Sequence, residues 1–74
     1  MENIQDILDV FVERLKDVMA QKGWNIKQLA ENLNVPRRTL NSWILKSRVP
    51  RIDYIVSIAN SLQVTTDYLL GRED

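Results

Sequence analysis

The first twenty residues carry an apolar stripe with the period of an α-helix, and this stripe constrains the fold more than any other feature. Val10 and Val12 lie off the stripe or at its edge. Asn3 is placed to cap the start, and Gly23 supplies the left-handed residue that ends a helix. The pattern predicts one long amphipathic helix that packs through a single face. The stripe spans an arc of about 120° and consists of Ile4, Ile7, Leu8, Phe11, Leu15, Val18 and Met19.

Two short helices are predicted to follow, separated by a tight turn. Asn25 and Gln28 have the spacing of a capping box, which starts a helix. Asn34 tolerates a positive φ, and Pro36 preorganises the first turn of a third helix that runs to about Leu45. The second helix is expected to bury Leu29, Ala30 and Leu33.

Two more helices complete the expected fold. A loop ends at Pro50, and Thr65 can cap a last short helix that stops at Gly71. The fourth helix, between them, is expected to bury Ile55, Ile58, Ala59 and Leu62. The fold class predicted from these patterns is all-α, with five helices of which the first is extended.

Length and composition limit what this helical chain can do. Its 74 residues are enough for one domain, over residues 1–74. It has no Cys and no His, so thiolate and imidazole chemistry is excluded, both for metal binding and for catalysis. No apolar run approaches the length of about 18 residues that a membrane span needs. We expect a soluble, cytoplasmic protein that is not an enzyme and that uses no cofactor or metal.

Charge is sorted along the chain although the formal net charge is zero. Residues 25–51 contain six cationic side chains and only one acid, whereas both flanking segments are acidic. A cationic segment of this kind attracts a polyanion even in a neutral molecule. Charge alone leaves open a solvated loop with a chance excess of arginine. The acidic residues of the first helix, Asp6, Asp9, Glu13 and Asp17, are interpreted as a solvated face, because no other groups converge on them.

The third helix divides into two faces. Leu40 and Trp43 point to one side, where they are expected to pack in the core, as is Trp24. The other side is a polar and cationic arc of about 140°, which contains Arg37, Arg38, Asn41, Ser42 and Leu45. The position of the arginines on the third helix therefore favours a cationic face that is exposed and available to a ligand.

The segment IKQLAENLNVPRRTLNSW, from Ile26 to Trp43, has the spacing of two helices that cross at a steep angle. Ala30 is small where the helices touch, and Asn34 lies at the turn between them. This segment resembles the helix-turn-helix of the Cro and phage-repressor class of DNA-binding proteins, the XRE-like family. The similarity continues in RLKDVMAQKG and IANSLQVTTDYLLG, and covers about residues 11–71. It implies a lambda-repressor-like five-helix domain, with the motif at about residues 26–45.

The resemblance also implies roles for individual residues. The third helix becomes the recognition helix, which lies in the major groove of DNA. Guanidinium groups pair with guanine and amides with adenine, so the base-reading positions are expected to be Arg37, Arg38, Asn41 and Ser42. Cations that flank the helix are expected to contact phosphates; these are Lys27, Lys46, Arg48 and Arg51. Ile26 departs from the family pattern, since it stands where a phosphate-binding Gln is frequent.

The expected function is a sequence-specific transcriptional regulator, of phage-repressor or bacterial type, that represses by binding a pseudo-palindromic operator in double-stranded DNA. A homodimer is expected, because one recognition helix reads too few base pairs. The contacts between the two copies are expected around residues 63–70. Two alternatives stay open for Ile44, Leu45 and residues 4–10: these residues either complete the core or contribute to the dimer contacts. Two alternatives stay open: an antitoxin-type autoregulator, and a protein-interaction module that does not bind DNA. A further regulatory domain or partner protein is also compatible with the sequence.

Overall fold

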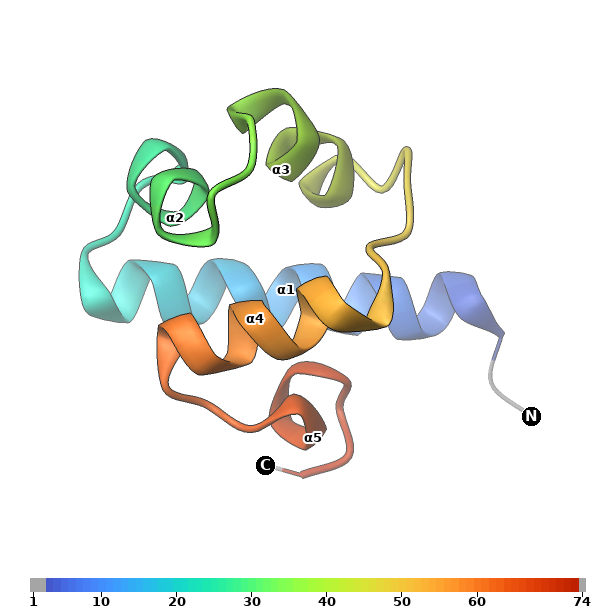
Figure 1. Cartoon of the computed structure of the whole chain (residues 1–74). Helices are drawn as coiled ribbons and strands as arrows, with labels where there is room; N and C mark the ends of the chain where they lie inside the picture. The colour runs from blue at the N-terminus through green and yellow to red at the C-terminus, as the bar shows by residue number, and fades with distance from the viewer. Residues whose placement is uncertain (1–2, 74) are drawn as a thin grey trace.

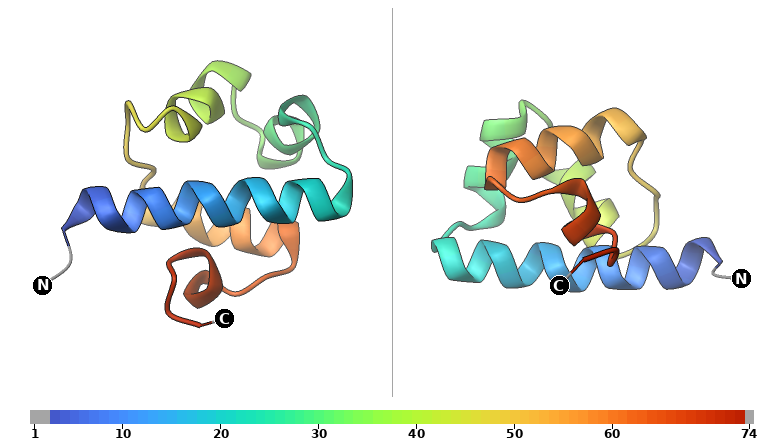
Figure 2. Two further views of the ribbon diagram at one scale, coloured as in Figure 1. Left: turned by 180° about the vertical axis from the view of Figure 1, so that it is seen from behind. Right: turned by 90° about the horizontal axis from the view of Figure 1, so that it is seen from below.

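The computed structural model describes residues 3–73 of the chain, and within that range every regular element is a helix. The long first helix crosses the molecule, with the second and third helices on one side of it and the last on the other (Figure 1; Figure 2). None of the helices in this range has the length and apolar character needed to cross a membrane. The predicted all-α class is confirmed. The five helices are α1 (Ile4–Lys22), α2 (Ile26–Leu33), α3 (Arg37–Ile44), α4 (Ile52–Leu62) and α5 (Thr66–Leu69).

The caps predicted from the sequence set the helix boundaries. The Asn3 side chain accepts a hydrogen bond from the backbone N–H of Asp6, at 2.9 Å, and starts α1. Asn25 and Gln28 form both bonds of a capping box at the start of α2, each 2.8 Å long. Thr65 caps α5 through the backbone N–H of Tyr68. These bonds satisfy backbone donors that a helix start leaves without partners.

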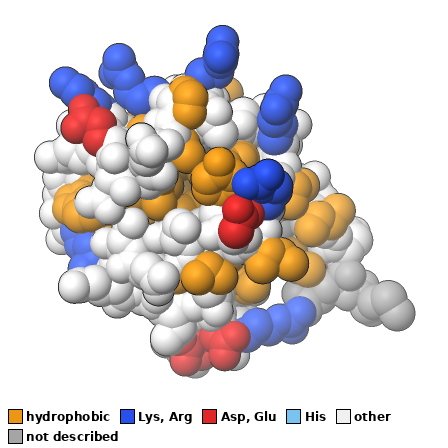
Figure 3. Space-filling view, in the orientation of Figure 1, with side chains coloured by type: hydrophobic (Ala, Val, Ile, Leu, Met, Phe, Trp, Pro, Cys, Tyr) orange, Lys and Arg blue, Asp and Glu red, His pale blue; other side chains and the backbone are white. Residues whose placement is uncertain are grey.

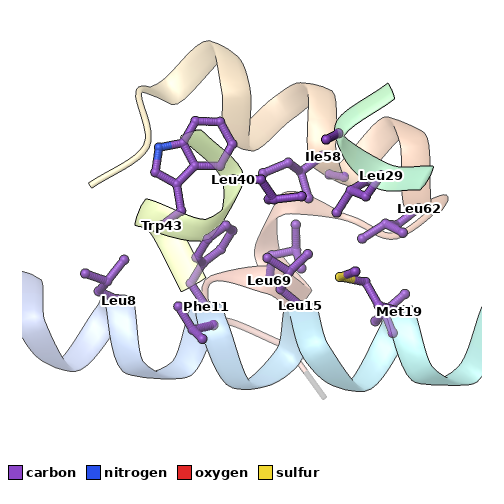
Figure 4. Close-up of a cluster of buried hydrophobic side chains, with 14 residues drawn as sticks. Leu8, Phe11, Leu15, Met19, Leu29, Leu40, Trp43, Ile58, Leu62 and Leu69 are labelled. Atoms are coloured by element: carbon purple, nitrogen blue, oxygen red, sulfur yellow. The ribbon is translucent and has the colours of Figure 1, made fainter. Parts of the chain in front are cut away.

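The core lies between α1 and the other four helices. Figure 4 shows four α1 side chains pointing into it: Leu8, Phe11, Leu15 and Met19. Each of the other helices contributes at least one buried side chain, such as Leu29, Leu40, Ile58, Leu62 and Leu69. No polar or charged residue in the described range is buried. Burial of apolar side chains is therefore the dominant stabilising interaction, at about 1.5–3 kcal/mol for each large side chain that leaves water completely.

At two positions of α1 the burial differs from the apolar stripe. Val12 is buried, with 2% of its surface exposed, although it lies off the stripe or at its edge. The segment after α3 approaches this flank of α1, where the Lys46 ammonium lies 2.8 Å from the Asp9 carboxylate. Ile4 is 59% exposed, because the first turn of α1 extends past the other helices (Figure 1). Leu33 and Ile55 pack against the core but are only partly buried.

The segment that follows α5 is held against α1 by Arg14. Its guanidinium donates hydrogen bonds to the backbone carbonyls of Tyr68, at 2.9 Å, and Glu73. The same guanidinium carbon lies 4.6 Å from the centre of the Tyr68 ring. Next to it, Gly71 has a φ of +78° and lies against Val10 of α1. A Cβ at position 71 would be 2.8 Å from Val10 Cγ1, closer than carbon atoms normally approach.

We expect Gly71→Ala to lower the free energy of unfolding by at least about 1–2 kcal/mol. The left-handed backbone disfavours a Cβ, and the contact with Val10 adds to the cost. Gly23→Ala is the matched control, since Gly23 has a φ of +70° but no atom within 4 Å of the position of a Cβ. Thermal unfolding of the two variants compares them. Equal losses of stability would show that the contact with Val10 contributes nothing.

Candidate nucleic-acid interface

The turn between α2 and α3 has the geometry that the sequence predicts. Asn34 adopts a left-handed conformation, with a φ of 58°. Its backbone N–H donates to the carbonyl of Glu31, and the N–H of Val35 donates to that of Ala30, at 3.1 and 3.0 Å. Ala30 is 2% exposed, because its small side chain lies in the helix joint. The turn therefore fixes the direction in which α3 leaves α2.

The third helix is anchored from behind by two apolar side chains, as predicted. Leu40 has no exposed surface and Trp43 has 3%. The Trp43 ring packs at a tilt on Tyr54 of α4, with the two ring centres 5.0 Å apart. Both side chains fix the rotation of α3 about its own axis, so the opposite face is held toward solvent. Trp24 is partly buried against the same core, which agrees with packing rather than free stacking.

The outward face of α3 carries the four predicted base-reading residues. Arg37, Arg38 and Asn41 are exposed, and Ser42 is partly buried. The Ser42 hydroxyl donates a hydrogen bond to the backbone carbonyl of Thr39, at 2.6 Å, so its oxygen is left to act as an acceptor. Both guanidiniums and the Asn41 amide keep donors for a ligand.

These residues separate into two rows along α3. Arg37 and Asn41 line a hollow on the α1 and α2 side, together with Lys27. Arg38 and Ser42 line a polar hollow on the other side, together with Arg48. Cationic side chains therefore lie on both flanks of the helix. In Figure 3, blue side chains gather along the edge of the molecule formed by α2, α3 and the segment after α3.

Two of the predicted phosphate ligands have acidic partners within the protein. The Lys46 ammonium pairs with Asp9, and this hydrogen bond is the main cause that lowers the pKa of the Asp9 carboxyl; Gln5 contributes a second bond. Arg51 pairs with Asp53 through two bonds, at 3.2 and 2.9 Å, and its guanidinium carbon lies 5.0 Å from the centre of the Tyr54 ring.

The remaining two predicted phosphate ligands, Lys27 and Arg48, are exposed. Helical periodicity and the sorting of charge along the chain predicted neither ion pair. Asp53 is only two residues from Arg51, so the sequence could have indicated this ion pair, whereas no residue near Lys46 in the sequence indicates its pairing with Asp9.

Across residues 3–73 there is no group of three or more acidic side chains arranged to hold a metal ion.

Comparison with known proteins gives the family. A family model described as helix-turn-helix matches residues 15–69, which include α2, α3, α4 and α5. The chain belongs to the helix-turn-helix family of the Cro and phage-repressor type. This family of transcriptional regulators is the one that the sequence of α2 and α3 indicates.

Several helix-turn-helix relatives come from Bacillus subtilis. The HTH-type transcriptional regulator ImmR is 34% identical over 62 residues, which are 84% of this chain and 49% of ImmR. The regulator YqaE is 34% identical over 64 residues, 86% of this chain and 55% of YqaE. The regulator AnsR is 27% identical, over 84% of this chain and 53% of AnsR. The chain thus spans about half the length of these curated relatives.

A solved structure supports the helix-turn-helix fold. The crystal structure of the hypothetical transcription factor NHTF from Neisseria superposes with a TM-score of 0.83, over 95% of this chain and 80% of that one. The sequence identity is 23%. The likeness therefore concerns the arrangement of the helices, which is retained although most side chains differ.

Proposed function

We propose that this chain is a DNA-binding transcriptional repressor that inserts α3 into the major groove of an operator. The observation that carries the proposal is the division of α3 into a buried and an exposed face. Leu40 and Trp43 fix the helix to the core, while Arg37 and Arg38 extend from the opposite side. A guanidinium can donate two hydrogen bonds to guanine, and an amide such as that of Asn41 can pair with adenine.

The cations around α3 support contact with the phosphate backbone. Lys27 lies on one flank of the helix and Arg48 on the other, so the two can reach backbone strands on both sides of a groove. Arg51 is 71% exposed at its side chain and keeps donor capacity beyond its pair with Asp53. Lys46 can contact a phosphate once its ammonium is released from the ion pair with Asp9. Neutralising several phosphates releases counterions, so binding should weaken steeply as salt increases.

In vitro selection from a random DNA pool, at near-physiological salt, tests the proposal. We expect an enriched site with two-fold symmetry and half-sites about one helical turn apart, roughly 34 Å. Binding that is indifferent to both sequence and salt would instead favour a protein-interaction module with the same fold. Co-purification of a second small protein with the chain would favour an antitoxin-type autoregulator.

The proposed repressor acts as a homodimer. In the predicted contact region, residues 63–70, Leu69 is buried and Tyr68 and Leu70 lie against the core, while Gln63, Thr65 and Asp67 are exposed. Of the five exposed large apolar side chains in the described range, two lie one turn apart on α4: Ile52, which is 81% exposed, and Val56. The other three are Ile4, Leu45 and Val49. Apolar side chains that are left in water in this way are suited to a partner surface.

We expect the chain to self-associate on operator DNA and Ile52→Ser to weaken that association. Removing one exposed large apolar side chain from a small two-fold interface removes it twice, once in each copy. Sedimentation of the protein alone and of its DNA complex measures the stoichiometry. A strict monomer in both conditions would rule out the dimer, and an unchanged stoichiometry for Ile52→Ser would place the contact elsewhere.

Asp9→Asn is expected to strengthen DNA binding without changing sequence preference. The substitution removes the charge that pairs with Lys46, so the ammonium becomes available to a phosphate. Because the pKa of Asp9 lies below its ordinary 3.8, its carboxylate is ionised at neutral pH, and this charge is lost only as the pH falls through the lowered pKa. Binding titrations over a range of salt should show a log–log slope steeper by up to about one phosphate contact. Unchanged affinity would mean that Lys46 does not reach the backbone.

A further inference from the structure

The hollow beside α3 has a lining that DNA binding alone does not require. It is a surface hollow of about 790 Å³ between the end of α1, the start of α2 and the flank of α3. Its apolar side chains are Met19, Ala20, Trp24, Ile26 and Ile44. Several of them, including Trp24 and Ile26, remain partly exposed although the rest of this edge is cationic. Groups that contact phosphates would be polar, so the apolar floor fits a different ligand.

The charge around this floor has one sign. Lys16, Lys27 and Arg37 line the hollow, and no acidic side chain does. The amides of Asn25 and Asn41 complete the lining. A ligand that matches this surface has an apolar body and an anionic group, because each part then meets its complement.

We propose that this hollow binds a small aromatic carboxylate. The ring of the ligand lies against Trp24 and Ile26, where a flat apolar group removes the most surface from water. The carboxylate pairs with Arg37 or Lys27, and a guanidinium can bind it through two parallel hydrogen bonds. An aromatic rather than an aliphatic body is favoured because the part of the Trp24 indole that lines the hollow can pack against a flat ring.

The position of the hollow gives binding a regulatory consequence, which rests on the proposed function. Arg37 and Asn41 belong both to this lining and to the predicted base-reading face. A carboxylate that pairs with Arg37 occupies the guanidinium N–H groups that would otherwise donate hydrogen bonds to guanine. The ligand and the operator are therefore mutually exclusive, and the carboxylate acts as an inducer that releases the protein from DNA.

The two tryptophans allow a direct test by NMR. Trp24 lines the hollow, whereas Trp43 is buried behind α3 and does not. We expect naphthalene-2-carboxylate to shift the indole N–H resonance of Trp24 saturably and to leave that of Trp43 in place. The neutral naphthalene-2-carboxamide has nearly the same shape and should bind at least about fivefold more weakly, because it lacks the charge. Equal shifts of both indoles, or equal affinity of the two probes, would overturn the proposal.

Two apolar side chains provide a matched pair of variants. Ile26 lines the hollow, while Val49 is 52% exposed on the segment after α3 and does not line it. Ile26→Gln should weaken binding of naphthalene-2-carboxylate about fivefold or more, and Val49→Gln by less than twofold. Lys27→Gln keeps the apolar floor and should reduce the preference for the carboxylate over the amide. A loss of binding that is greater in Val49→Gln would place the probe on the segment after α3 and refute the site.

Competition with DNA separates the two proposals. Saturating naphthalene-2-carboxylate should reduce binding to the selected operator by at least about tenfold, and the amide should have a much smaller effect. If the NMR shifts are found but the chain binds no DNA, the site stands and the proposed function fails. If the probe and the operator bind together without affecting each other, the site does not overlap the recognition face and the inducer role is refuted.

Discussion

Leu40→Ala is expected to lower the free energy of unfolding by about 2–5 kcal/mol, one of the largest effects of any single substitution in this chain. Leu40 has no exposed surface and holds α3 against the core, so its loss removes buried methyl groups and leaves a cavity. A small domain has a total stability of only about 5–15 kcal/mol. The variant should therefore be partly unfolded near body temperature.

Leu45→Ala is the matched control for this experiment. Leu45 is the residue that ends the same helix, but its exposed fraction is 76%. Leu45 ends the helix through its backbone N–H, which Ala keeps. Replacing its exposed side chain should therefore change stability by no more than about 0.5 kcal/mol. Urea unfolding curves of the two variants and the parent chain give the comparison. Similar midpoints for Leu40→Ala and the parent would mean that the back of α3 is not part of the cooperative core.

Local features of the fold could be predicted because they depend on residues close together in the chain. The capping box of Asn25 and Gln28 and the left-handed Asn34 each involve backbone groups within about one helical turn. The same holds for the rotation of α3, since the spacing of Leu40 and Trp43 decides which face is buried. Helical periodicity therefore placed the exposed arginines correctly.

Long-range contacts could not be predicted in the same way. The pair of Lys46 with Asp9 joins the segment after α3 to the first helix, and the periodicity of α1 does not indicate it. The burial of Val12 follows from the same approach of two distant segments. Such contacts depend on how helices are placed in space, and periodicity describes each helix by itself. For the same reason, the sequence could indicate cations near α3 but not which of them have acidic partners.

The hollow beside α3 also depends on a spatial arrangement that the sequence does not indicate. In the sequence, Ile26 is only a departure from a family position that often holds a phosphate ligand. In the structure it forms one wall of an apolar floor with Trp24 and Ile44, which come from different segments. A substitution that is unfavourable for one ligand thus contributes to a surface suited to another. Only the spatial arrangement of the three side chains makes this visible.

Arg37→Ala and Arg38→Ala test the central functional proposal. If either guanidinium reads a guanine, its removal should cost about 1–3 kcal/mol of binding free energy, or roughly 5- to 150-fold in Kd. The loss should be confined to operators that carry that guanine. Lys27→Ala is the matched control, because a phosphate contact should weaken binding to all sequences by a similar factor and reduce the salt slope by about one.

A double-mutant cycle between protein and DNA distinguishes the two kinds of contact. Each arginine variant is measured on the selected operator and on operators with one base pair changed at a time. Where an arginine reads a base, the two changes together should cost little more than either alone, because both remove the same pair of hydrogen bonds. Both arginines lie on the exposed face of α3 but line different hollows, so we expect them to couple to different base pairs. Additive costs at every position, with both variants weakening all sequences equally, would make them phosphate clamps and leave base reading to Asn41 and Ser42.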